Sequence, residues 1–156
     1  MRIPIYQIDA FSSQPFKGNP AAVCPLKEWL PDEVMQSIAM ENNLSETAFF
    51  IKNEDQYDIR WFAPKIEIDL AGHPTLATAH VIFNEMNHQG DSITFNSKIG
   101  DTLDITRNKD IISMNFPSRP PKKIYKKELI EEAIGVEVEE FYENRDGLAV
   151  VANEEI

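Results

Sequence analysis

The most continuous apolar run of the chain lies between residues 74 and 87 and predicts a helix. Its hydrophobic residues, spaced so that almost no polar face remains, are Leu76, Ala77, Ala79, Val81, Ile82 and Phe83. A helix that is apolar on every side is normally buried on every side. Pro74 suits the first turn, because the N–H group that proline lacks would have no partner there. We therefore expect a central helix over about residues 74–87, surrounded by other elements.

Alternation of apolar and polar residues on both sides of this helix predicts short strands. They are expected at residues 2–10, 21–26, 46–53, 56–63, 66–70, 91–97, 100–106 and 110–116. A surface helix is expected to begin at Pro31, because Leu30, Val34 and Ile38 form one apolar stripe. Short strands at even spacing around one buried helix favour a closed or nearly closed sheet. The expected fold class is α+β, with a mixed barrel-like sheet around the central helix.

A proline-rich segment interrupts this pattern after residue 116. Pro117, Pro120 and Pro121 predict a linker over residues 117–123. Residues 124–156 contain one predicted helix, ended by Gly135, and two short predicted strands. About 35 residues are too few to bury a core of their own. We expect an N-terminal lobe over residues 1–116 and the beginning of an incomplete second lobe over residues 124–156.

The charge balance of the chain argues against some classes of binding partner. Among 156 residues, 15 are basic and 26 acidic, which gives a net charge of -11. Nucleic acids and anionic membranes both require a basic surface, so neither is an expected partner. No apolar run approaches the roughly 18 residues of a membrane span. The single cysteine, Cys24, rules out an internal disulfide and fits a reducing compartment, so we expect a cytoplasmic protein.

The residues around the predicted central helix suggest a site for an anion. Gly72 and His73 stand at its N-terminal end, where free backbone N–H groups attract a carboxylate or a phosphate. His73 could orient a substrate or carry a proton, and a simple capping role is an equal alternative. His80 lies about 10 Å further along the helix, which is too far to share a metal ion with His73.

Glu46 is the candidate acid or base. It begins an apolar strand, between Leu44 and the pair Phe49–Phe50, and apolar surroundings make a carboxylate a stronger base. The alternative is an ordinary exposed carboxylate at the end of a strand. The neighbouring Ser45 could donate a hydrogen bond to a substrate, or could bond only to the local backbone.

Three segments in this order resemble the PhzF family of phenazine-biosynthesis-like isomerases, which is related to diaminopimelate epimerase. Residues 9–23 read DAFSSQPFKGNPAAV, residues 35–49 read MQSIAMENNLSETAF, and residues 59–77 read IRWFAPKIEIDLAGHPTLA. The resemblance covers residues 1–121 firmly and the tail loosely. It implies a diaminopimelate epimerase-like lobe, a barrel-like sheet around a central helix, with the active site in a cleft between two such lobes.

The resemblance also implies roles for particular residues. Glu46 matches the proton-transferring residue of the family, and Gly72 and His73 match residues that line its substrate site. The turn that contains Asn19 lies near the cleft in the family, so Asn19 is a further substrate-site candidate. The implied reaction is a proton shift on a small carboxylated substrate, without a metal or an organic cofactor. Ala71 stands where many relatives carry a cysteine, which leaves Glu46 as the base in this half.

The chain departs from the family in length, since family members are close to twice as long. We expect a truncated PhzF-like isomerase in which two chains meet as a homodimer, each supplying one wall of the site. The alternative is a non-catalytic half-length lobe that acts as a binding or self-associating module.

Overall fold

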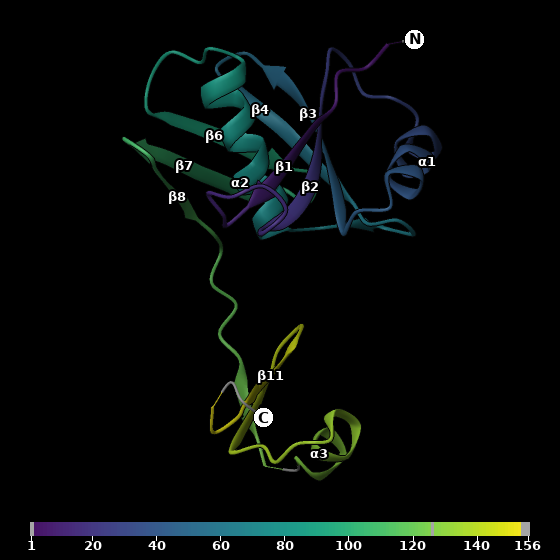
Figure 1. Cartoon of the computed structure of the whole chain (residues 1–156), viewed down its shortest axis with the longest axis vertical. Helices are drawn as coiled ribbons and strands as arrows, with labels where there is room; N and C mark the ends of the chain where they lie inside the picture. The colour runs from purple at the N-terminus through teal and green to yellow at the C-terminus, as the bar shows by residue number, and fades with distance from the viewer. Residues whose placement is uncertain (1, 126, 154–156) are drawn as a thin grey trace. The chain divides into compact units, whose positions relative to one another are not determined.

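A curled mixed sheet surrounds one helix in the N-terminal part of the chain (Figure 1). The computed structural model describes residues 2–125 and 127–153. Within it the chain divides into two compact units, Met1–Phe116 and Pro117–Ile156.

The sheet of the first unit has eight strands. They are β1 (Tyr6–Ala10), β2 (Asn19–Leu26), β3 (Glu46–Asn53), β4 (Gln56–Phe62), β5 (Glu67–Ile68), β6 (Ser92–Ser97), β7 (Thr102–Asn108) and β8 (Ile111–Asn115). Seven of them follow the order β1-β2-β3-β4-β6-β7-β8, and β5 pairs with β4. The pairs β2–β3 and β4–β6 are parallel, and the other pairs are antiparallel.

Each parallel pair is joined through a helix, as parallel neighbours require a crossover connection. The helix α1 (Asp32–Asn42) connects β2 to β3, and α2 (Gly72–His80) lies in the connection from β4 to β6. Figure 1 shows α2 in the middle of this unit, enclosed by the strands. The main core forms between α2 and the inner face of the sheet, where Phe50, Trp61 and Phe95 are buried.

The prediction of a buried central helix is confirmed, with different limits. It begins at Gly72 rather than at residue 74, and after His80 it continues as one π-helical turn, Val81–Glu85. The two buried threonines of α2 satisfy their own hydroxyl groups: Thr75 donates to the Ala71 carbonyl and Thr78 to the Pro74 carbonyl. The helix therefore lies in an apolar core without an unpaired hydroxyl.

A second apolar cluster lies on the outer face of the same sheet. Met35 and Ala39 of α1 pack there with Cys24, Phe49 and Phe62. Because β3 is covered on both faces, its sequence is apolar without alternation from Ala48 to Phe50. Asn43 ends α1 with a φ of 50°, in the left-handed conformation that asparagine tolerates.

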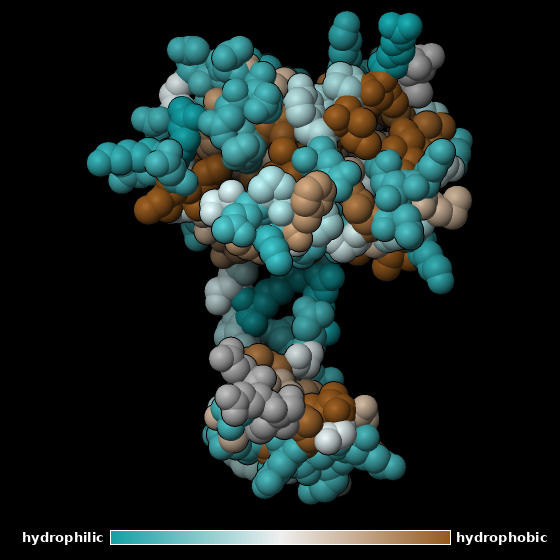
Figure 2. Space-filling view, viewed as in Figure 1, coloured by the Kyte–Doolittle hydropathy of each residue, from teal (hydrophilic) through white to brown (hydrophobic). Residues whose placement is uncertain are grey.

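Two predicted strands are shorter than expected. The first begins at Tyr6 rather than at residue 2, and the segment expected at 66–70 pairs only at Glu67–Ile68. The N-terminal segment lines a cavity of about 470 Å³ together with apolar residues that include Leu26, Leu30 and Met86. Figure 2 shows hydrophobic side chains gathered on the surface of this unit beside α1 and the N-terminal segment.

The second unit contains a three-stranded antiparallel sheet and one short helix. Its elements are β9 (Lys122–Ile124), α3 (Glu128–Ile134), β10 (Glu140–Glu143) and β11 (Gly147–Val150), in the sheet order β11-β10-β9. β9 begins inside the segment that the prolines predict as a linker. The buried hydrophobic residues of this unit are Val138 and Phe141. Within the described residues of both units, no helix is long and apolar enough to cross a membrane.

Candidate functional site

Glu46 is the first residue of β3, and the sheet register directs it towards α2. It pairs with Ala21 of the parallel strand β2. Ala21, and Ala48 two residues further along β3, both belong to the core cluster that packs against α2. Since alternate residues of a strand share one face, the Glu46 side chain lies on this inner face, and it is 20% exposed.

His73, in the first turn of α2, lies against this carboxylate. The distance from His73 Nε2 to Glu46 Oε2 is 3.2 Å, and the His73 side chain is 11% exposed. Glu46 Oε2 is buried and forms no hydrogen bond with any residue that the structure describes. The contact is thus close enough for charge attraction but lacks the geometry of a hydrogen bond, which leaves one carboxylate oxygen available to another donor.

Ser45 connects His73 to the turn before β2. Its Oγ lies 3.2 Å from His73 Nε2 and 3.4 Å from Asn19 Oδ1. The single hydroxyl proton can be donated to the Asn19 amide oxygen, and His73 Nε2–H can then donate to Ser45 Oγ. With Glu46 Oε2 also beside it, Nε2 faces two acceptors, which favours the tautomer that carries its proton on Nε2.

The N-terminal end of α2 leaves backbone donors free in the same place. Ala71 precedes the helix and provides no capping side chain. Pro74 has no N–H group, so the N–H groups of this first turn that have no acceptor within the helix are those of Gly72 and His73. A side-chain carbon added at Gly72 would have no atom within 4 Å, so open space lies beside this backbone. The arrangement suits an anion, with an acid or base next to it.

Close backbone packing holds the turn that carries Asn19. A side chain on Gly18 would lie 2.3 Å from the Ala10 carbonyl oxygen, so only glycine fits. Asp9 Oδ2 accepts the backbone N–H of Phe16 at 2.7 Å. Phe11 and Phe16 both have a φ of 65° and are exposed. These contacts fix the loop that precedes β2.

A family model of phenazine biosynthesis-like proteins matches residues 8–151 of the chain. The chain belongs to this PhzC-PhzF family.

The relatives of this PhzF-family chain include proteins named as isomerases. An uncharacterized isomerase of Pseudomonas aeruginosa is 44% identical over 99% of the chain, which covers 59% of that relative. An uncharacterized isomerase of Halalkalibacterium halodurans is 45% identical over 94% of the chain and 55% of its own length. The chain thus spans little more than half the length of these relatives.

Solved structures support the same assignment. The crystal structure of a PhzF-family phenazine biosynthesis protein from Enterococcus faecalis matches with a TM-score of 0.89 and 46% identity, over 99% of this chain and 59% of that one. A predicted epimerase from Pseudomonas aeruginosa matches with a TM-score of 0.61 at 23% identity, over 77% of this chain and 46% of that one. The second match shows a shared fold.

The PhzF-family lobe has a second polar cluster, on the outer face of the sheet. Arg60 donates from Nε and Nη2 to the Glu67 carboxylate, at 2.7 and 2.8 Å, and from Nη1 to Asp32 at 2.9 Å. These hydrogen bonds hold the pKa of Glu67 below its usual range. Lys98 also approaches Glu67, at 2.7 Å. The opposite charges therefore pair with one another within the cluster.

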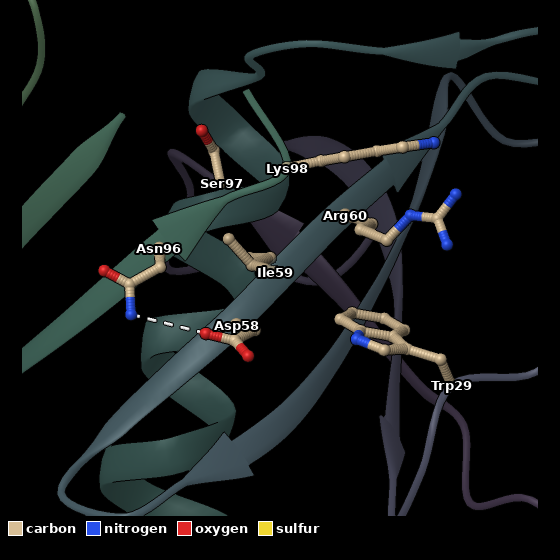
Figure 3. Close-up of a pocket in the computed structure, with 7 residues that line it drawn as sticks. All are labelled: Trp29, Asp58, Ile59, Arg60, Asn96, Ser97 and Lys98. Atoms are coloured by element: carbon tan, nitrogen blue, oxygen red, sulfur yellow. Dashed lines mark hydrogen bonds between the residues drawn. The ribbon is translucent and has the colours of Figure 1, made fainter. Parts of the chain in front are cut away.

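A cavity of about 330 Å³ borders this cluster. Figure 3 shows Lys98 and Trp29 on either side of Arg60, with Asp58 next to the Trp29 ring. Arg60 pairs with Phe49 in the sheet register, and Phe49 belongs to the outer apolar cluster. The cavity thus lies on the face opposite Glu46. On the Glu46 side, in contrast, Glu46 Oε2 has no hydrogen-bond partner among the described residues.

The structure brings together all five residues predicted for the site. Glu46, His73, Ser45 and Asn19 form a chain of contacts, and Gly72 adjoins His73 in the same turn. Sequence reasoning missed Asp9, whose signal was its place before the turn-rich segment. No group of three or more His, Cys, Asp or Glu side chains suited to a metal ion occurs among residues 2–125 and 127–153.

Proposed function

We propose that this chain carries the proton-transferring half of an isomerase that acts on a small carboxylated substrate. The observation that supports the proposal most directly is the 3.2 Å approach of Glu46 Oε2 to His73 Nε2 at the uncapped end of α2. This places a general acid or base beside donors for an anion. The isomerase names of the relatives agree with this chemistry.

In the proposed reaction, the substrate carboxylate binds the backbone N–H groups of Gly72 and His73. Glu46 removes a proton from a carbon atom next to that carboxylate, or conjugated with it. The C–H bonding pair moves into the conjugated system, and the backbone N–H groups of Gly72 and His73 stabilise the negative charge that develops on the carboxylate oxygens. The protonated Glu46 then returns its proton to another carbon, which restores the carboxylate and shifts a double bond without any cofactor.

The proposal includes a second copy of the chain as partner. Gly72, Asn19 and Ser45 are exposed, and the exposed side chains of Phe11 and Phe16 adjoin the same turn. Exposed apolar side chains of this size often mark contact surfaces. A symmetric homodimer that covers this face would provide the second wall and exclude water. Sedimentation velocity tests this part, because a monomer at all concentrations would contradict it.

Isotope exchange tests the chemistry. The purified chain is incubated in D2O with dienoic acids and with amino acids, and deuterium at carbon is measured by mass spectrometry. We expect uptake with the wild type and a loss of about 10²-fold to 10⁴-fold in Glu46→Gln, since that is the usual contribution of a general acid or base. Glu41→Gln, an exposed change on α1, is the matched control. Equal uptake in wild type and Glu46→Gln, or none in either, would rule out the proposal.

A binding module without turnover is the second candidate. The uncapped N–H groups of α2 and the exposed Phe11 and Phe16 suit a lobe that holds an anion and associates with itself. Saturable binding of a carboxylate by calorimetry, together with no deuterium uptake, would favour this function. Weak binding in Gly72→Pro, which removes one of the donors, would place the ligand at α2.

A further inference from the structure

The indole of Trp61 is an unexplained donor in the core. Trp61 lies in β4 and is 1% exposed. Its Nε1–H is buried and donates to no residue that the structure describes. Buried donors almost always have a partner, because an unpaired one loses its hydration without replacement. The N–H group of Trp61 therefore calls for an acceptor on the same face of the sheet.

The sheet register places Glu46 on that face. Trp61 pairs with Ala48 across the antiparallel strands β3 and β4, and Glu46 stands two residues before Ala48. Glu46 and Trp61 are therefore diagonal neighbours on the inner face. Diagonal neighbours have Cβ atoms roughly 7–8 Å apart, within reach of aromatic and long side chains. Ala48, which has only a small side chain, is the cross-strand partner of Trp61 and lies on the same face as Glu46.

Glu46 has a buried acceptor without a hydrogen-bond donor. Its Oε2 is buried and accepts no hydrogen bond from the described residues, although His73 Nε2 lies 3.2 Å away. Two unsatisfied polar atoms of opposite role thus occur on adjacent strands of one face. The other ionisable groups near them are His73 of α2 and Asp69, which follows the Trp61 partner Ile68. From β2, the neighbour of Glu46 is the apolar Ala21.

We propose that Trp61 Nε1–H is a positioning donor for the Glu46 carboxylate. A rotation of the Glu46 side chain about its own torsions, away from His73, brings an ionised oxygen to the indole. Glu46 then has two resting partners, His73 on the substrate side and Trp61 on the core side. The catalytic part of this inference rests on the proposed function, because it concerns the position of the Glu46 carboxylate between proton transfers. Trp61 acts only through Glu46, so its proposed role is to position that carboxylate.

Nitrogen-15 NMR tests the pairing without any substrate. The chain has two tryptophans, so its spectrum has two indole N–H signals, which Trp29→Phe assigns. We expect the Trp61 signal to move with pH in the acid range and to lose that movement in Glu46→Gln. The Trp29 signal, from a ring that lies over Arg60, is the internal reference and should be the same in wild type and Glu46→Gln.

Asp69→Asn tests whether the Asp69 carboxylate, rather than that of Glu46, accepts the hydrogen bond from Trp61. The pH-dependent movement of the Trp61 signal should persist in Asp69→Asn. An unmoving signal in the wild type, an unchanged movement in Glu46→Gln, or a movement lost only in Asp69→Asn would overturn the inference.

The catalytic consequence is measured apart from the pairing. In the deuterium assay, Trp61→Phe should lower kcat and leave KM unchanged, and a KM effect alone would contradict a positioning role for Trp61. If the wild type gives no uptake, the proposed function fails, while the NMR result still decides whether Trp61 and Glu46 interact.

Discussion

Glu46 Oε2 and His73 Nε2 lie 3.2 Å apart, where the start of β3 meets the first turn of α2. The two side chains are 20% and 11% exposed, and the carboxylate oxygen in this contact accepts no hydrogen bond from the described residues. A buried charge that is only partly compensated does little for stability. We therefore expect this contact to add little to the stability of the fold.

The first prediction follows from the missing hydrogen bond to Glu46 Oε2. Glu46→Gln should leave the free energy of unfolding unchanged or raise it by about 1 kcal/mol, because it removes a partly buried charge whose Oε2 accepts no hydrogen bond from the described residues. Urea unfolding monitored by tryptophan fluorescence measures the change. A loss of stability above about 1 kcal/mol would show that the carboxylate is a structural group.

The glycine before His73 offers a second test. A methyl group at Gly72 would meet no atom within 4 Å, and φ at this position is not positive. Gly72→Ala should therefore keep the stability or raise it by roughly 0.4–1 kcal/mol, since alanine restricts the unfolded chain. If an anion binds at this turn, the same methyl group should weaken its binding, as calorimetry would show. Unchanged binding would place the anion elsewhere.

Much of the secondary structure in both units follows from local sequence pattern. Strand β3 has the predicted limits and helix α3 ends at the predicted Gly135, and both Asn43 and Gly135 end their helices in left-handed conformations. The all-round apolar composition of α2 correctly predicts its burial. These features depend on residues close together in the chain, whose periodicity and backbone preferences are visible without the fold.

Contacts between residues far apart in the sequence could not be predicted from local patterns. The parallel pairing of β4 with β6 forms across the whole α2 connection. His88 lies beyond the end of the predicted helix, and it is partly buried and contacts the Tyr57 hydroxyl at 3.3 Å and the Ser92 carbonyl at 3.1 Å. The approach of His73 to Glu46 likewise depends on how α2 crosses the sheet. Only the family resemblance suggested that these two residues share a site.

The Arg60 cluster was missed for a related reason. An arginine between Ile59 and Trp61 reads as the polar side of an alternating strand, whereas this strand is covered on both faces. Arg60 is 8% exposed because Asp32 and Glu67, from α1 and β5, satisfy it. The short strand β5, which contains Glu67, has no local sequence pattern that would predict its ion pair with Arg60.

Gly18 provides a test of backbone packing. Gly18→Ala should cost about 1–3 kcal/mol, because its methyl carbon would lie 2.3 Å from the Ala10 carbonyl oxygen and must displace the loop before β2. Gly72→Ala is the matched control, since the same methyl group meets open space there. Thermal unfolding of the two variants gives the comparison. Equal midpoints would mean that the loop adapts without strain.

Glu67 should make stability sensitive to acid. Hydrogen bonds from Arg60 lower the pKa of Glu67 in the folded state. A lowered folded-state pKa adds stability above the unfolded value of about 4.3, and this stability is lost as pH falls through the folded value. Glu67→Gln should thus cost about 1–3 kcal/mol at pH 7, and less in acid below both values. Urea titrations at each pH measure the difference, with Glu41→Gln as control. A constant difference would contradict the linkage.

Cys24 should report on the opening of the outer cluster. The thiol lies in β2, is 1% exposed, and packs with Met35 and Phe49. Burial raises the pKa of Cys24 to about 12, and the thiolate is the reactive form, so the folded chain should resist a thiol reagent at pH 8. Mass spectrometry after a timed pulse of iodoacetamide should find unmodified native protein and one label per chain in urea. Because the label enters only when α1 leaves the sheet, the native rate should increase in Met35→Ala, whose cavity loosens that contact. Rapid labelling of the native chain would show instead that α1 is not held against β2.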